Sequence, residues 1–179
     1  MAAHATFVAG IEIPSSSPVF LAVAEFHVAA GIICVIAGII AMLSAKRPGR
    51  HPLFGTVYYW VLSAVFGSAA ALSAMRWAED YYLLILGTLS FAAATLGRIA
   101  RRLRWAGWVR LHVAGMGMSY ILLLTAFYVD NGRSLPVWKD LPHIAYWLAP
   151  GVIGAPLIIR ALLQHPPEQH QSKKRDIAL

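Results

Sequence analysis

The chain has 179 residues, of which 59% are hydrophobic and only 13% are charged. This composition excludes a water-soluble globule, because too few polar side chains remain to cover its surface. The formal net charge of +7 could indicate a nucleic-acid partner. The basic residues lie at the ends of long apolar blocks, however, so we expect a lipid bilayer as the partner and no nucleic acid.

Five apolar blocks, each about 18 residues or longer, predict five transmembrane helices. The predicted spans are 19–45, 52–75, 81–99, 105–129 and 142–164. The fifth block contains Pro150 and Pro156 between glycines, which predicts a kinked or locally unwound helix. We expect residues 1–17 to be an exposed N-terminal segment, 18–164 to form a single all-α bundle, and 165–179 to be a polar cytoplasmic tail.

The distribution of Lys and Arg predicts the orientation. The basic residues that flank one end of the predicted spans are Lys46, Arg47, Arg50, Arg98, Arg101, Arg102, Arg104, Arg110, Arg160, Lys173, Lys174 and Arg175. Those at the other end are Arg76, Arg133 and Lys139. Because Lys and Arg concentrate on the cytoplasmic side, we expect the N-terminus outside and the C-terminus in the cytoplasm. A multi-pass protein of a bacterial inner membrane is the resulting expectation.

Four histidines are the candidate cofactor and metal ligands. At about 1.5 Å per residue, His27 and His143 fall at a similar depth near the outer face, and His51 and His112 fall near the inner face. Facing imidazoles from two helices at one depth can hold a haem iron in a bundle core. Two such pairs would suit two b-type haems stacked across the membrane. The glycines that lie one turn from a histidine, and would leave room for a macrocycle, are Gly31, Gly55 and Gly115.

Structural roles would explain the same histidines. His51 precedes Pro52, which disfavours helical backbone at His51, so His51 could cap a helix at the headgroup level. His143 could likewise be an interfacial residue in the first turn of its helix. Glu25 is a candidate for proton transfer, because an acidic side chain inside a span usually faces the bundle interior or a polar cavity. Alternatively, it reaches water at the outer boundary.

Several segments, in their order along the chain, resemble a known family. They are HVAAG from His27, GRHPLFGTVY around His51, RLHVAGMGMSYILLLTAFYVDN from Arg110, and SLP followed by YWLAPGVIGAPLI. Together they resemble small bacterial membrane proteins that share a domain of unknown function (number 2306), over about residues 27 to 160. The resemblance implies a membrane protein and points to His27, His51 and His112, but it implies no reaction.

The leading functional hypothesis is a b-type haem or quinone-linked electron-transfer protein. In this hypothesis His27 and His143 are the outer ligands, and His51 and His112 are the inner ones. A non-enzymatic accessory or scaffold subunit of a larger membrane complex is the first alternative. A small transporter is the second, suggested by the interrupted fifth span. The sequence contains no phosphate-binding glycine loop, nucleophile elbow or zinc-protease helix that would assign an enzyme class.

Overall fold

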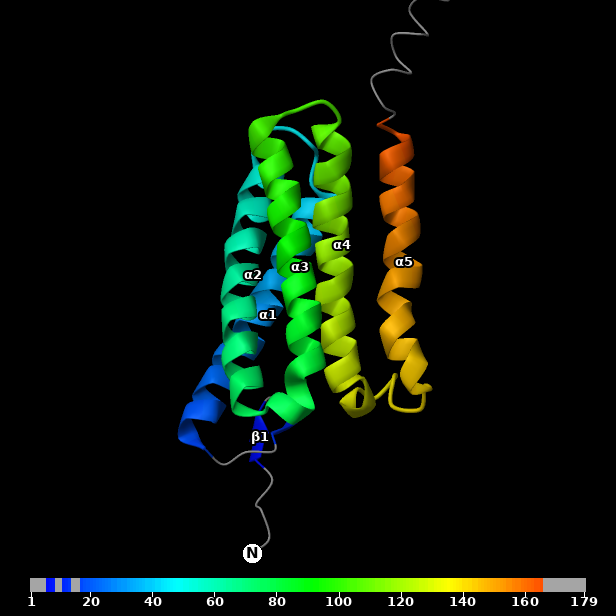
Figure 1. Cartoon of the computed structure of the whole chain (residues 1–179). Helices are drawn as coiled ribbons and strands as arrows, with labels where there is room; N and C mark the ends of the chain where they lie inside the picture. The colour runs from blue at the N-terminus through cyan, green and yellow to red at the C-terminus, as the bar shows by residue number, and fades with distance from the viewer. Residues whose placement is uncertain (1–5, 9–10, 14–16, 166–179) are drawn as a thin grey trace, which may run out of the picture.

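The computed structural model describes residues 6–8, 11–13 and 17–165, and its main feature is a set of five long helices (Figure 1). They are α1 (Pro18–Leu43), α2 (Arg50–Met75), α3 (Trp77–Leu103), α4 (Trp108–Asn131) and α5 (His143–Leu163). The shorter elements are an antiparallel hairpin of β1 (Thr6–Val8) and β2 (Ile11–Ile13) before α1, and a 3-10 turn η1 (Gly132–Ser134) after α4. All five long helices are long and apolar enough to cross a membrane. The prediction of a helical bundle with five such helices is confirmed.

The helices differ in detail from the predicted spans. α3 begins at Trp77, directly after Arg76, whose φ of −140° and ψ of 54° end α2. α5 is one continuous helix through both of its prolines, so the expected local unwinding is absent there. In apolar surroundings, backbone groups that leave the helix would lose their hydrogen-bond partners, which favours continuity. Of the expected N-terminal segment, the described residues include the hairpin; of the expected tail they include only His165.

Helices α1 to α4 run up and down as a four-helix bundle, and α5 lies against the outer side of α4 (Figure 1). The close backbone contacts are those of α1 with α2, α2 with α3, α3 with α4, and α4 with α5. Glycines allow the close contacts of α3 with α4 and of α4 with α5. A Cβ atom at Gly115 would lie 2.6 Å from the carbonyl oxygen of Ala93 on α3. At the α4–α5 interface, Gly117 packs under Ile158 and Gly154 under Ile121.

Hydrogen bonds between buried side chains join the helices in the middle of the bundle. The Tyr58 hydroxyl on α2 lies 2.7 Å from the Ser119 hydroxyl on α4, and the Ser90 hydroxyl on α3 donates to the Ser119 carbonyl at 2.8 Å. The Tyr120 hydroxyl donates to the Val35 carbonyl on α1. Bonds of this kind between membrane helices contribute about 0.6 to 2 kcal/mol each. The side chains that make these bonds occupy the middle of the bundle. The candidate histidines lie toward its two ends.

Candidate cofactor site between His51 and His112

Two histidines meet at the end of the bundle where α1 and α3 end and α2 and α4 begin, which we call the basic end. His51 is the second residue of α2 and His112 the fifth of α4. Both side chains are half-buried. Their ring centroids are 6.2 Å apart, with an interplanar angle of 90°. The structure therefore brings together the two residues predicted as the inner pair.

Hydrogen bonds to backbone carbonyls hold both imidazole rings. The Nδ1 atom of His51 lies 2.9 Å from the carbonyl oxygen of Ala41 on α1, and Nδ1 of His112 lies 3.0 Å from that of Gly97 on α3. A carbonyl oxygen only accepts, so Nδ1 carries the proton in both rings. In the neutral ring Nε2 then has a free lone pair. Metal-binding histidines commonly have this arrangement, in which a carbonyl fixes the tautomer and the ring orientation.

The local sequence explains why His51 reaches α1. Ala41 lies in the last turn of its helix, where carbonyl groups lack an intrahelical donor. Its carbonyl accepts from His51 and from the Lys46 ammonium group at 3.2 Å, and Lys46 also donates to the Met42 carbonyl at 2.6 Å. Gly49, with a φ of 122°, makes the sharp reversal that starts α2. His51 is thus inside the helix and closes the end of α1, rather than being the cap of its own helix.

Close packing of α3 on α4 explains the position of His112. A Cβ atom at Gly97 would lie 3.2 Å from both the His112 carbonyl oxygen and the Met116 nitrogen. A Cβ atom here would crowd both backbone atoms, so glycine favours the close approach of the two helices. The same packing fills the space beside Gly115, so the room expected there for a macrocycle is taken by α3. At Gly31 and Gly55, an added Cβ atom would meet no atom within 4 Å.

Positive charge surrounds the pair. Lys46 and Arg101 lie close enough to His112 to interact with its charge. Partial burial lowers the pKa of the Lys46 ammonium group below its ordinary value. The sequence has no Asp or Glu between Glu25 and Glu79. A cofactor that carries carboxylates would meet the cations Lys46 and Arg101 beside this pair.

The two outer histidines lie on separate helix pairs. The Nδ1 atom of His27 is 2.9 Å from the hydroxyl of Ser68 on α2. Ser68 donates its own proton to the Ala64 or Val65 carbonyl, so its oxygen accepts from His27. His143 is exposed at the start of α5, with its ring 5.9 Å from that of Tyr146. Figure 1 shows the first turns of α1 and α5 at opposite edges of the molecule. The similar depth predicted from the sequence does not bring these two residues together.

Glu25 is exposed on the outer surface of α1 and does not face the interior of the bundle. It lies two residues from His27, and residues at this spacing point in different directions on a helix. The expectation that Glu25 faces an interior polar cavity therefore has no support in its position. The open alternative is that its carboxylate reaches the membrane surface.

Arg110 has a role that the sequence did not indicate. Its guanidinium group donates to the carbonyls of Leu162 and His165, both at 2.7 Å. These carbonyls lie at the end of α5, where helices lack internal donors. Arg110 therefore fastens α5 to the start of α4. The contact joins residues more than 50 positions apart. The position of Arg110, two residues before His112, does not predict it.

The donor set at the basic end favours one kind of metal centre. Among residues 17–165, no group of three or more His, Cys, Asp or Glu side chains is placed to hold a metal ion. A bare zinc ion usually takes four ligands, three or four of them from protein. A haem iron takes four from its macrocycle and needs only axial ligands from the chain. Two imidazoles therefore fit haem better than a free ion.

Comparisons with known proteins found no matching family model, no matching curated protein and no matching solved structure. Membership of the family named above therefore stays a prediction.

Proposed function

We propose that this chain is a membrane electron-transfer protein that holds one b-type haem between His51 and His112. The observation that carries the proposal is the pair of half-buried imidazoles 6.2 Å apart, each oriented through Nδ1 by a carbonyl of a neighbouring helix. Metal–imidazole bonds of about 2.0–2.1 Å place the centroids of two opposed rings roughly 6 to 6.5 Å apart. The observed centroid separation of 6.2 Å falls within this range.

Each nearby residue has a role in this proposal. His51 and His112 would ligate the haem iron through Nε2, and the carbonyls of Ala41 and Gly97, by accepting from Nδ1, would leave both Nε2 lone pairs free for it. Lys46 and Arg101 neutralise the carboxylates of the cofactor. Bound haem supplies reversible one-electron transfer. The chain thereby provides ligation, orientation and compensating charge, while a quinone or a larger membrane complex is the proposed electron partner.

The proposal includes an orientation. With the basic end in the cytoplasm, as the excess of Lys and Arg favours, the N-terminus is outside and the haem lies near the cytoplasmic surface of a bacterial inner membrane. The proposal replaces the expected two haems by one, because His27 and His143 lack a shared helix interface. Electrons would then enter and leave on the cytoplasmic side.

A non-enzymatic accessory subunit is the second candidate. It is favoured by the fact that the same histidine bonds join α1 to α2 and α3 to α4, which is a structural role in itself. In this alternative the bundle needs no cofactor. The outward apolar faces of α1 and α5, which include Ile33, Ile36, Val152 and Ile153, would pack against a larger complex.

A visible absorption spectrum separates the two candidates. The protein is purified in detergent from cells supplied with a haem precursor, and its spectrum is recorded after air oxidation and after dithionite reduction. The electron-transfer proposal predicts a Soret band, sharp α and β bands on reduction, and about one haem per chain on extraction. A colourless protein from haem-replete cells would contradict it and favour the accessory subunit.

A further inference from the structure

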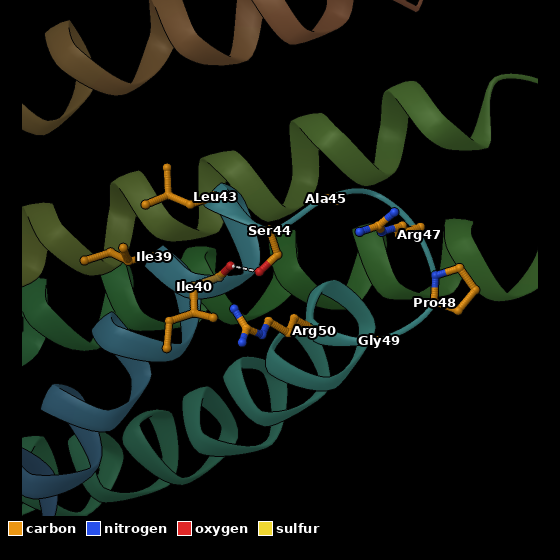
Figure 2. Close-up of a pocket in the computed structure, with 9 residues that line it drawn as sticks. All are labelled: Ile39, Ile40, Leu43, Ser44, Ala45, Arg47, Pro48, Gly49 and Arg50. Carbon is orange, nitrogen blue, oxygen red and sulfur yellow. Dashed lines mark hydrogen bonds between the residues drawn. The ribbon is translucent and has the colours of Figure 1, made fainter.

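An open groove lies between the end of α1 and the start of α2 (Figure 2). Its volume is about 630 Å³. One side is lined by Ile39, Ile40 and Leu43 of α1, and the other by the loop that contains Arg47 and by Arg50. The groove therefore combines an apolar wall with two cationic side chains.

The groove lies where a bilayer changes from hydrocarbon to headgroups. α1 has 26 residues, so it is about 39 Å long and exceeds the roughly 30 Å hydrocarbon core. Because Lys46 and Arg47 follow its last turn, we expect that turn at a membrane interface. Leu43 is 83% exposed and Ile39 is 42% exposed, and both are available to acyl chains. The arginines follow directly at the level of lipid phosphates.

The two arginines are available to a ligand. Lys46, just before them in the sequence, directs its ammonium group to the carbonyls that end α1. Ser44 is likewise occupied, because its hydroxyl donates to the Ile40 carbonyl (Figure 2). Within the part of the chain that the structure describes, neither Arg47 nor Arg50 makes a side-chain hydrogen bond or ion pair. Figure 2 shows the side chain of Arg50 extending toward Ile40 along the groove.

We propose that this groove binds an anionic phospholipid, with its phosphate at Arg47 and Arg50 and its acyl chains along Ile39 and Leu43. Guanidinium groups match phosphate oxygens through paired hydrogen bonds. The apolar wall adds contacts that inorganic phosphate cannot make. Bound lipid would hold the short connection from α1 to α2, the segment that positions His51. The lipid site does not depend on the presence of haem.

The test is native mass spectrometry of the detergent-purified full chain, titrated with phosphatidylglycerol. The variant R47Q/R50Q is compared with R102Q/R160Q, which removes the same charge from exposed arginines outside the groove. We expect the wild type and the control pair to bind the lipid alike. Binding by R47Q/R50Q is expected to be weaker by about tenfold or more. Equal weakening in both double variants would show diffuse charge attraction and overturn the proposal.

Two further arms identify the ligand. Phosphatidylcholine and inorganic phosphate are tested as stabilisers against heat beside phosphatidylglycerol, and only phosphatidylglycerol is expected to raise the unfolding temperature of the wild type. If inorganic phosphate raised the unfolding temperature as much as phosphatidylglycerol does, the groove would be a general anion site. That result would contradict the proposal of a lipid ligand. Should R47Q/R50Q not fold, L43Q keeps both arginines and removes apolar contact. Unchanged phosphatidylglycerol binding by L43Q would then contradict the proposed contact of the acyl chains with Leu43.

Discussion

The histidines at the two ends of the bundle have different contacts. At the basic end, His51 and His112 come from helices on opposite sides of the bundle, and their rings lie 6.2 Å apart. At the other end, His27 bonds to Ser68 on the next helix, while His143 is exposed on α5. The sequence predicts a similar depth for the two members of each pair. The difference indicates that a similar predicted depth brings two histidines together only when their helices also face each other.

Connection length accounts for much of this difference. Six residues join α1 to α2 and four join α3 to α4, and short connections make consecutive helices antiparallel neighbours. The beginnings of α2 and α4 are thereby held at one end of the same four-helix bundle. Eleven residues join α4 to α5. α5 packs on the outside of α4, so its first residue, His143, lies away from the α1–α2 pair.

The largest expected effect separates the two pairs directly. H51A and H112A should each abolish the reduced-minus-oxidised haem spectrum, because loss of one axial ligand leaves the iron with a single anchor. H27A and H143A should retain it, since neither residue shares an interface with the proposed site. Comparable loss of absorbance in H27A would show that the opposite end also binds haem.

The second effect concerns the packing that places His112. G115A puts a methyl group 2.6 Å from the Ala93 oxygen and 2.9 Å from the Gly97 nitrogen, both backbone atoms. Overpacking of this kind costs about 1–3 kcal/mol, so we expect a lower unfolding temperature and weaker haem retention. The matched control is G31A, which meets no atom within 4 Å and should be as stable as the wild type. Equal stability of G115A would contradict the close α3–α4 contact.

A smaller effect tests whether α5 lies outside the cofactor site. R110A removes two charge-assisted bonds to the end of α5, worth about 1.5–3 kcal/mol each in general but less at this partly exposed end. Hydrogen exchange should become faster in the last turns of α5, while the haem spectrum stays unchanged. R160A, on an exposed residue of the same helix, is the control. An altered spectrum in R110A would place α5 in contact with the site.

The smallest effect is expected at Ser68. S68A removes the acceptor for His27 and should cost about 0.6 kcal/mol, a typical value for such bonds between membrane helices. Thermal unfolding in detergent measures the loss, with S63A as a control, since the Ser63 hydroxyl bonds only to the carbonyl of Tyr59 in its own helix. A loss of haem from S68A would contradict a purely structural role for His27.

The number of long helices and the meeting of His51 with His112 could be predicted, because block length and short connections determine them. For Glu25, the sequence left an inward and an outward position open. A membrane helix is apolar on its lipid-facing side as well as its packed side, so apolar periodicity does not identify the buried face. For the same reason, nothing along the sequence indicated that Tyr58 and Ser119 meet. The unbroken α5 depends on backbone satisfaction in an apolar environment rather than on the helix-breaking tendency of Pro150.

That His51 and His112 are the two axial ligands of one haem is tested most directly by low-temperature electron paramagnetic resonance of the oxidised protein. The predicted result is a low-spin ferric signal of large anisotropy, as expected for the perpendicular imidazole planes of His51 and His112, which is lost in H112A. A low-spin signal that is unchanged in H112A would contradict the assignment.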